Sequence, residues 1–249
     1  SLAVCLLFSF VNPEHERMVA EAARRRGIPV SASHEVLPQH REYERTSTTV
    51  ANAYVLPLVD RYLRHMETAL AGEGFTGRFL LMLSSGTLAA PDVARRFPVR
   101  LLESGPAAGA LLSGFVGATI GRPDLVGFDM GGTTAKICLV REGRPKVAPM
   151  MEVARVHRFK PGSGLPVKTP VVDMIEIGAG GGSVAAIDEV GLLKVGPHSA
   201  GADPGPACYA RGGTQATVTD SNLLLGYLDP GYFLGGRMTL DVAAAERAL

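Results

Sequence analysis

Gly127-Phe128-Asp129-Met130-Gly131-Gly132-Thr133-Thr134-Ala135-Lys136 is the stretch around which the rest of the chain is interpreted. An apolar strand pattern leads to Asp129, two glycines follow, and two threonines open a second strand pattern, which predicts a β-hairpin. Glycines expose backbone N–H groups and can take positive φ, and threonine hydroxyls add donors, so the turn suits a phosphate. A purely structural hairpin is the alternative, because the same residues are common in turns.

The position of Asp129 predicts a magnesium site. A carboxylate next to a phosphate is repulsive unless Mg²⁺ or water lies between them, so Asp129 is expected to hold hydrated Mg²⁺ or to orient water. Other phosphate loops are excluded, because the chain has neither GxxxxGK[ST] nor a GxGxxG that opens a helix after a strand. It also has no GxSxG nucleophile elbow.

Composition narrows the classes of protein to which the chain can belong. The 249 residues carry a net charge of +1, with 46% hydrophobic and 20% charged residues, which excludes intrinsic disorder and gives no general basis for binding nucleic acid or anionic membrane. The three cysteines lie far apart, without a CxxC pair, which favours a reducing cytoplasm. No apolar stretch reaches the length of a membrane-spanning helix.

Strand and helix patterns alternate along the first half of the chain and predict an α/β fold with a partly parallel sheet. We expect two domains, 1–120 and 121–249. Because residue 1 leads directly into an apolar run and the last helix has no C-cap signal, we expect the chain to be part of a longer protein. Strands are predicted over 2–11, 28–33, 79–83, 125–129, 135–140, 153–159 and 171–177. Helices are predicted over 13–26 with Asn12 as N-cap, 44–70 with a break or kink near Pro57, 91–97, 107–116, 223–227 and 241–249 with Asp241 as N-cap.

A second glycine-rich segment follows Asp173 and Glu176. Four of the five residues 178–182 are glycine, and Ser183 follows them. Such a run does not favour the interior of a strand or helix, and it supplies further accessible N–H groups. Its alternative is a structural turn at a point where backbones cross.

The segment 195–222 contains His198, Asp203 and Cys208, which could be imagined as metal ligands. Their spacing matches no zinc pattern, and a long proline-rich loop is a poor cage, so a loop at the rim of an active site is the better interpretation. Asp220 and Asn222 are expected to cap the helix predicted over 223–227.

The residues before the hairpin extend the pattern. A small-residue helix around 104–116, followed by a strand–DxGGT–strand hairpin, resembles the actin, hexokinase and heat-shock chaperone ATPase superfamily, whose lobes have a ribonuclease H-like fold. By that resemblance the helix is a hinge between two lobes, the hairpin is the second phosphate motif, and the glycine run faces the phosphates.

Five ordered blocks carry a more specific resemblance. They are 41–54 (REYERTSTTVANAY), 101–109 (LLESGPAAG), 128–136 (FDMGGTTAK), 177–183 (IGAGGGS) and 200–209 (AGADPGPACY). Together they look like the hydantoinase A/5-oxoprolinase family, which includes N-methylhydantoinase and the ATP-dependent acetone and acetophenone carboxylases. The resemblance covers nearly all of residues 3–240.

This resemblance implies an ATP- and Mg²⁺-dependent enzyme that phosphorylates the oxygen of a cyclic amide, so that water can open the ring. Asp129, Gly131, Gly132, Thr133 and Thr134 would hold phosphates and Mg²⁺. Gly180, Gly181, Gly182 and Ser183 would form the opposing cradle. Asp129, Asp173 and Glu176 are the candidate catalytic acids. Lys136 stands where several relatives carry Asp, which leaves the role of that position open.

The resemblance also leaves alternatives. A ketone carboxylase subunit of the same family and a non-enzymatic actin-like ATPase remain possible functions, as does a small-molecule kinase. The implied partners are a cyclic amide or ketone substrate and a second, hydantoinase B-like subunit or domain. Because the family carries a first phosphate motif in a preceding segment, the chain by itself is expected to have little or no activity.

Overall fold

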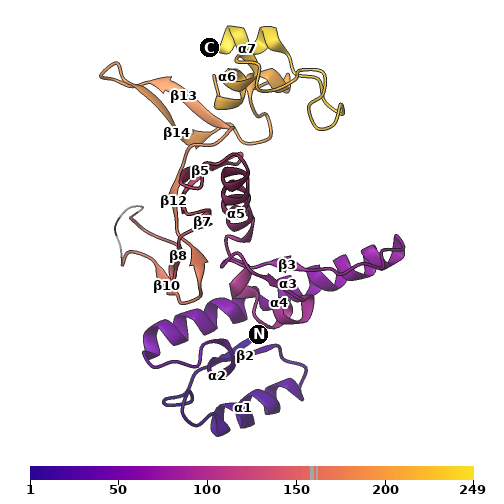
Figure 1. Ribbon diagram of the computed structural model, residues 1–249, viewed down its shortest axis with the longest axis vertical. Coiled ribbons are helices and arrows are strands. Elements are labelled where there is room, and N and C mark those ends of the chain that lie inside the picture. The colour runs from indigo at the N-terminus through magenta and orange to yellow at the C-terminus, as the bar shows by residue number, and fades with distance from the viewer. Residues whose placement is uncertain (158–159, 161) are drawn as a thin grey trace. The chain divides into compact units, whose positions relative to one another are not determined.

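The computed structural model describes residues 1–157, 160 and 162–249. The described chain divides into two compact units (Figure 1). Unit 1 comprises Ser1–Leu125 and Val140–Asp173, and unit 2 comprises Val126–Leu139 and Met174–Leu249. The predicted division into ATPase lobes at residue 120 stays a prediction, but the predicted α/β character is confirmed.

Unit 1 begins with a parallel strand pair, β1 (Leu2–Val4) and β2 (Val30–Ala32), joined by helix α1 (Glu14–Arg24). The helix packs on both strands, and Figure 1 shows it beside β2. Small alanines on α1 and branched residues on the strands form the core between them: Val4, Ala20, Ala23, Val30 and Ala32. The expected partly parallel pairing is therefore confirmed.

The strand predicted over 2–11 is wrong beyond Val4. Residues 5–11 form turns in which Phe8 has a φ of 56°. Polar contacts explain the turns, because the Leu6 N–H donates to buried Glu16 and the Leu6 carbonyl accepts from buried Arg45. Apolar composition alone predicted a strand here, whereas the buried charges decide the structure.

Helix α1 begins one residue later than predicted. Pro13 is the N-cap, and Asn12 Oδ1 accepts a hydrogen bond from the Glu14 N–H at 3.1 Å. After Arg24 the chain turns, and Gly27 adopts a φ of 73°, which is the left-handed conformation expected where a helix ends.

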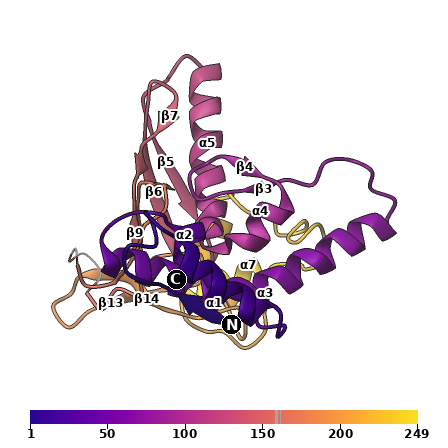
Figure 2. The same ribbon diagram turned by 90° about the horizontal axis from the view of Figure 1, so that it is seen from below.

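Helix α3 (Glu42–Gly72) runs without interruption through Pro57, so the predicted break is absent (Figure 2). A proline cannot donate to the carbonyl four residues before it, which leaves the Ala53 carbonyl without its helical partner. The Ser1 hydroxyl donates to that carbonyl at 2.7 Å. The lost hydrogen bond is thus replaced from outside the helix.

Short elements complete the first part of unit 1. They are α2 (Ser33–Val36), the hairpin β3 (Leu81–Met82) and β4 (Leu88–Ala89), α4 (Pro91–Arg96), the 3₁₀ helix η1 (Pro98–Leu101) and α5 (Ser104–Thr119). The small residues of α5 admit close backbone contacts. A Cβ at Gly114 would lie 2.6 Å from the Gly143 carbonyl oxygen, and one at Gly117 would lie 2.6 Å from the Arg122 oxygen.

Antiparallel strand pairs complete the second part of unit 1. They are β8 (Val147–Ala148) with β11 (Val171–Val172), β9 (Met151–Val153) with β10 (Leu165–Val167), and β7 (Arg144–Pro145) with the end of β6. The strand predicted over 153–159 is absent from 154–157, and Arg158 and Phe159 lie outside the described residues.

Unit 2 contains most of an antiparallel sheet in the order β12 (Met174–Ile177), β6 (Ala135–Arg141), β5 (Leu125–Met130). A hairpin of β13 (Ser183–Ile187) and β14 (Leu193–Ser199) follows. The 3₁₀ helix η2 (Ala207–Tyr209) and helices α6 (Val218–Leu224) and α7 (Val242–Ala248) share a core of Cys208, Leu223, Leu240 and Ala245.

Two helix caps in unit 2 test the sequence predictions. Asp241 Oδ1 accepts from the Ala244 N–H at 2.9 Å, so the predicted N-cap of α7 is confirmed. The helix predicted over 223–227 instead spans Val218–Leu224. Its N-cap is Thr217, and Asp220 lies inside the first turn.

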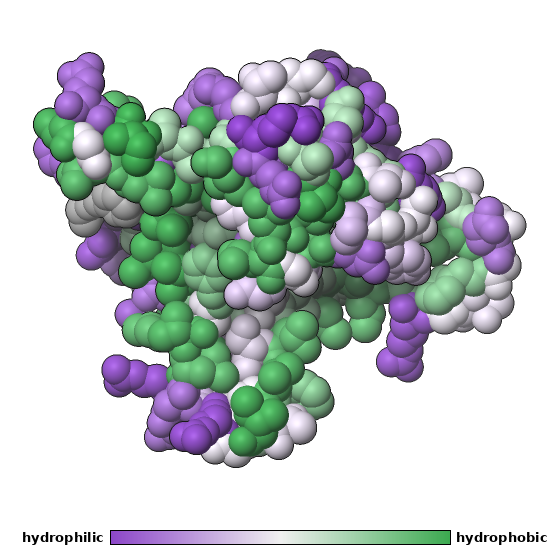
Figure 3. All heavy atoms as spheres, turned by 90° about the horizontal axis from the view of Figure 1, so that it is seen from above, coloured by the Kyte–Doolittle hydropathy of each residue, from purple (hydrophilic) through white to green (hydrophobic). Residues whose placement is uncertain are grey.

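Both units carry large apolar side chains on their surfaces, and the face shown in Figure 3 displays such side chains in green. Examples are Leu112 and Phe115 on α5, and Ile187 and Leu193 on the β13–β14 hairpin. Within the described residues, no helix combines the length and the apolar composition that crossing a membrane requires.

Candidate phosphate site

The predicted hairpin is formed by β5 and β6. The Gly131 N–H donates to the Thr134 carbonyl at 2.9 Å and closes the turn. Gly132 and Thr133 lie exposed at the tip, outside both strands, and their amides have no acceptor within the described part of the chain. The tip therefore carries two adjacent backbone donors that no protein acceptor engages.

The sequence suggested that the two glycines of this turn allow a positive φ, but the turn does not use that conformation. Neither Gly131 nor Gly132 is among the residues with positive φ. A Cβ added at Gly132 would meet no protein atom within 4 Å. Nothing in the described protein requires glycine at position 132, so the bare backbone there leaves room for an external group at the tip.

The glycine-rich turn lies directly against the hairpin. The Gly181 N–H donates to the Gly131 oxygen at 2.9 Å, and the Gly182 N–H donates to the Gly132 oxygen at 2.8 Å. Gly180 is the closest approach, because a Cβ there would lie 2.6 Å from the backbone nitrogen of Thr133. The two segments are therefore in direct contact, and their joint role in one phosphate site stays a prediction.

All four amides of the turn are engaged within the protein. Besides the two bonds to the hairpin, the Gly180 N–H donates to Ser183 Oγ at 2.8 Å, and the Ser183 N–H donates to the Gly180 oxygen at 2.9 Å. The turn therefore supports the hairpin through backbone hydrogen bonds. Direct donation from these amides to a phosphate stays a prediction.

Two further segments hold the glycine turn from behind. The amide and the hydroxyl of Thr219 both donate to the Gly181 oxygen at 2.8 Å. The Ala200 N–H donates to the Gly182 oxygen, also at 2.8 Å. Thr219 has no role in the sequence prediction, because the helix was expected to begin only at residue 223, whereas it begins at Val218.

The segment 200–209 is anchored by Asp220, which is completely buried. Its carboxylate accepts from the Cys208 N–H at 2.8 Å and from the Thr217 N–H and hydroxyl at 2.9 and 2.7 Å. Asp220 also completes a capping box with Thr217. The same carboxylate thus fixes the start of α6 and the loop before it.

The trio His198, Asp203 and Cys208 is not assembled as a ligand set. His198 and Asp203 are exposed, whereas Cys208 is completely buried. Burial first, and then the hydrogen bond and charge of Asp220, raise the pKa of Cys208 to about 12, so the thiol stays protonated. In the described ranges, no group of three or more His, Cys, Asp or Glu residues is placed to bind a metal ion.

The three candidate acids fall in different surroundings. Asp129 is exposed near the end of β5, and Glu176 lies on β12 directly opposite Lys136 of β6. Asp173 belongs to unit 1 and forms an ion pair with Lys146 at 2.7 Å. Asp129 and Glu176 therefore share one sheet, and a catalytic role for each of the three acids stays a prediction.

A polar face of α3 was also missed in the sequence. Arg45, Thr48, Thr49 and Asn52 are all at least 99% buried. They recur at helical spacing within the quoted block 41–54, and that spacing was the signal that could have revealed them. Asn52 bonds Ser31 and the Val99 N–H, so this face ties the first strand pair to η1.

Known proteins resemble the chain over its whole length. The family model for hydantoinase/oxoprolinase matches residues 45–249. The caprolactamase subunit alpha of Pseudomonas jessenii is 39% identical over 100% of this chain and 35% of its own length. The 5-oxoprolinase of Saccharomyces cerevisiae is 35% identical over 94% of this chain and 17% of its own.

Two solved structures share the fold. A nucleotide-free structure of ATP-dependent acetone carboxylase matches with a TM-score of 0.74 and 30% identity, over 99% of this chain and 34% of that one. The ATP-dependent caprolactamase of Pseudomonas jessenii matches with a TM-score of 0.71 and 39% identity, over 99% and 35%. The chain spans about a third or less of the length of these relatives. Since the family model covers most of the residues, the chain belongs to the hydantoinase/oxoprolinase family.

Proposed function

We propose that the protein carrying this chain is an ATP-dependent enzyme that opens a cyclic amide by phosphorylating the amide oxygen. The hairpin of β5 and β6 binds the phosphates, with Gly131, Gly132, Thr133 and Thr134 at the turn. Resonance makes an amide carbon a poor electrophile, and transfer of a phosphoryl group to its oxygen turns that oxygen into a leaving group. Two relatives, caprolactamase and 5-oxoprolinase, are named for lactam substrates.

The exposed tip of the hairpin is the observation that carries this proposal. The Gly132 and Thr133 amides are unengaged, and the missing side chain at Gly132 leaves open space beside them. Adjacent backbone donors on an exposed turn attract anions. The buried support by Gly181, Gly182 and Thr219 fixes these donors before any ligand arrives, so little ordering is needed on binding.

Asp129 fits the magnesium that such a reaction uses. Mg²⁺ bound to nucleotides takes only one or two protein carboxylates, and phosphate oxygens and water complete its shell. Asp129 is exposed two residues before the hairpin turn, and none of its carboxylate hydrogen bonds is committed within the described chain. When bound, the metal supplies positive charge that offsets phosphate repulsion, and Asp129 would hold it through one carboxylate oxygen or a water.

The other candidate site residues would have supporting or catalytic roles around the hairpin. Thr133 and Thr134 would add hydroxyl donors to the phosphates, and Gly180, Gly181, Gly182 and Ser183 would keep the hairpin in place while lying against it. Glu176 and Asp173 are proposed as bases that accept a proton from the attacking water. These roles are assigned by chemical type and by position in the chain.

The proposal includes the wider architecture. Residues 1–120 and 121–249 would belong to two actin-like lobes, with α5 as the hinge helix, and a hydantoinase B-like subunit or domain would complete the active site. Relatives named as subunits of caprolactamase, acetophenone carboxylase and acetone carboxylase support a multi-subunit enzyme. The three free cysteines are in keeping with a cytoplasmic enzyme.

A ketone carboxylase is the second candidate function. The structural match to acetone carboxylase favours it as much as the match to caprolactamase favours a lactam hydrolase, because the TM-scores are 0.74 and 0.71. Both reactions require the same phosphate site. They differ in the second reactant, which is water in one case and bicarbonate in the other.

The test is a steady-state ATPase assay on the full-length protein, with lactams and ketones added in the presence and absence of bicarbonate. We expect lactams to stimulate phosphate release without bicarbonate. Gly132→Val should abolish nucleotide binding, measured by calorimetry with a non-hydrolysable ATP analogue and Mg²⁺. Gly231→Val, an exposed turn glycine of the same unit with ordinary φ, is the matched control. Stimulation by ketone plus bicarbonate alone would establish the carboxylase instead, and undiminished nucleotide binding by Gly132→Val would refute the hairpin site.

A further inference from the structure

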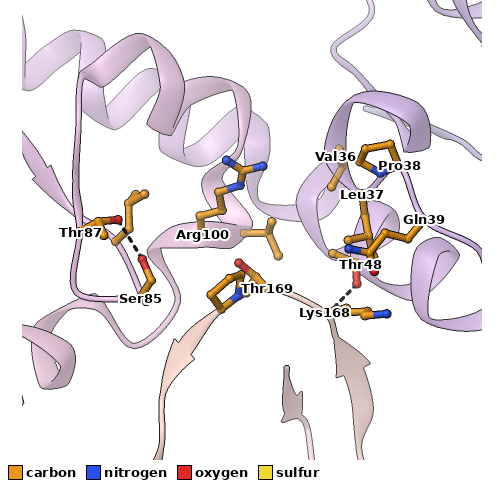
Figure 4. A pocket seen from close by; sticks show the side chains of 13 residues that line it. Val36, Leu37, Pro38, Gln39, Thr48, Ser85, Thr87, Arg100, Lys168 and Thr169 are labelled. Atoms are coloured by element: carbon orange, nitrogen blue, oxygen red, sulfur yellow. Dashed lines mark hydrogen bonds between the residues drawn. The ribbon is translucent and has the colours of Figure 1, made fainter. Parts of the chain in front are cut away.

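Unit 1 contains a pocket of about 360 Å³ that the proposed function does not use. Five separate stretches of the chain form it: residues 36–39, Thr48 of α3, residues 83–87 around the β3–β4 loop, residues 99–100 of η1, and residues 168–170 between β10 and β11. Figure 4 shows Arg100 and Thr169 between the wall carrying Ser85 and Thr87 and the wall carrying residues 36–39. The volume lies at the lower end of the roughly 300–1,000 Å³ typical of small-molecule sites.

Thr169 is the first sign that the pocket accepts a ligand. The residue is only 5% exposed, yet its hydroxyl has no hydrogen-bond partner in the described chain. The oxygen of this hydroxyl is not fully sealed from solvent. Because Thr169 lines the pocket, a molecule in the pocket can reach the hydroxyl. Buried hydroxyls are normally paired, and this one is available to a bound molecule.

The neighbouring hydroxyls give the pocket further hydrogen-bonding capacity. Ser85 and Thr87 lie 2.9 Å apart at their hydroxyls, and only one of the two can donate to the other, which leaves one proton for a ligand. The Thr48 hydroxyl, in contrast, donates to the Glu44 carbonyl and accepts from the Lys168 N–H. Thr48 therefore fixes the segment 168–170 in position.

The charge of the pocket is entirely positive. Arg100 and Lys168 line it, and none of its thirteen lining residues is acidic. Within the described residues neither side chain has an ion-pair partner, whereas the Arg100 guanidinium stacks on the Phe97 ring at 4.6 Å. Stacking on an aromatic ring holds the guanidinium in one orientation while its N–H edge remains available to an anion.

The other walls are apolar and include Val36, Leu37, Leu83, Val99 and Pro170. A free inorganic anion would gain nothing from these walls, whereas an organic acid would bury its hydrocarbon part against them. We propose that this pocket binds a small organic carboxylate, with its carboxylate at Arg100 and the Thr169 hydroxyl and its hydrocarbon part against the apolar walls. The proposal goes beyond the proposed function and involves none of its residues.

The experiment is calorimetric titration of the full-length protein without ATP, using cyclopentanecarboxylate as the probe. Its neutral amide and inorganic phosphate are the comparison probes. We expect the carboxylate to bind and the amide to bind at least about tenfold more weakly, because hydrogen bonds to charged groups contribute roughly 1.5–3 kcal/mol and 1.4 kcal/mol is tenfold. Thr169→Val should weaken binding about fivefold without lowering the melting temperature, since no internal hydrogen bond is lost.

Arg100→Gln should weaken binding about tenfold or more, whereas Arg17→Gln, an exposed arginine of α1 without an ion pair, should leave it unchanged. Equal affinity for acid and amide, or unchanged affinity in Thr169→Val, would overturn the proposal. Tight binding of phosphate that depends on Arg100 would identify an inorganic anion site and also overturn it. Because no nucleotide is present, failure here leaves the ATP proposal untouched.

Discussion

Glu16 is the residue whose replacement should damage unit 1 most clearly. Its carboxylate is completely buried between α1 and the turns that follow β1. One oxygen accepts from the Leu6 N–H at 2.7 Å and the Ser33 hydroxyl at 2.6 Å. The other accepts from the His34 N–H at 2.9 Å and from His34 Nδ1 at 2.7 Å. Each oxygen therefore serves two donors.

Glu16→Gln keeps the shape of the side chain and replaces one oxygen with an NH₂ group. Whichever oxygen is replaced, the backbone N–H that donates to it, from Leu6 or from His34, then faces another donor, whereas its second partner, the Ser33 hydroxyl or the His34 ring, can turn and accept from the new NH₂ group. Since a hydrogen bond to a charged group is worth about 1.5–3 kcal/mol, we expect a loss of about 1.5–3 kcal/mol or more in the free energy of unfolding of unit 1. At about 2–4 °C per kcal/mol for a chain of this size, the melting temperature should fall by about 3 °C or more.

The matched control is Glu21→Gln on the same helix. Glu21 is 63% exposed at its side chain and lies 3.9 Å from Arg25, so its ion pair contributes at most a few tenths of a kcal/mol. Differential scanning calorimetry and circular dichroism would measure both variants beside the unmodified protein. If Glu16→Gln lowers stability no more than Glu21→Gln does, the buried carboxylate does not stabilise unit 1 as argued.

The same carboxylate predicts a pH dependence. Burial alone would raise the pKa of Glu16, but the hydrogen bonds from Ser33, from the His34 and Leu6 amides and from the His34 ring outweigh it and lower the pKa below the usual 4.5. A carboxyl group with a depressed pKa in the folded state stabilises the protein above its unfolded pKa, and that stabilisation is lost as the pH falls. The difference between the unmodified protein and Glu16→Gln should therefore be full at neutral pH and shrink as the pH falls below 4.5.

Three further predictions concern other parts of the chain. Thr219→Val removes one of the two donors to the Gly181 oxygen, and we expect the KM for ATP to rise severalfold with a smaller change in kcat, measured by steady-state ATPase kinetics. Cys208, with a pKa of about 12, should resist alkylation at pH 8 while half-buried Cys5 reacts, as peptide mass spectrometry would show. Gly117→Ala should destabilise the protein by about 1–3 kcal/mol, because its Cβ would lie 2.6 Å from the Arg122 carbonyl oxygen, whereas Gly105→Ala, with open space around it, should be neutral or stabilising in a thermal melt.

The hairpin and the parallel start of unit 1 could be predicted because local residues determine them. Asp129 and the two following glycines mark a turn between two apolar runs, and Asp241 marks a helix start. Prediction from the sequence failed where a buried charged residue, distant in the chain, determines the backbone conformation. Residues 5–11 have the composition of a strand, but Glu16 and Arg45 hold Leu6 in a turn through hydrogen bonds that no local pattern announces.

In the candidate site, too, some features could be predicted from the sequence and others could not. That Gly180 and its neighbours belong with the hairpin could be inferred from a family resemblance. Their donation to the hairpin carbonyls could not be inferred, because a run of glycines indicates accessible N–H groups but does not indicate which acceptors they bind. The pocket at Arg100 and Thr169 could not be predicted from the sequence, since its walls come from five separate stretches of the chain.

The contrast between the two glycine sites leads to a last prediction. A Cβ at Gly132 meets no protein atom, whereas a Cβ at Gly180 would lie 2.6 Å from the Thr133 backbone and must displace the hairpin. Gly132→Ala should therefore weaken nucleotide binding while the melting temperature stays within about 1 °C, and Gly180→Ala should lower both together.

Calorimetric titration of an ATP analogue and a thermal melt on each variant measure the two quantities. Equal loss of stability in both variants would mean that Gly132 serves the fold and that the hairpin is the purely structural turn which its sequence also allows. A loss of binding in Gly180→Ala without any loss of stability would mean that the glycine turn touches the phosphates itself, and the amides that now donate to the hairpin would have to change partners when nucleotide binds.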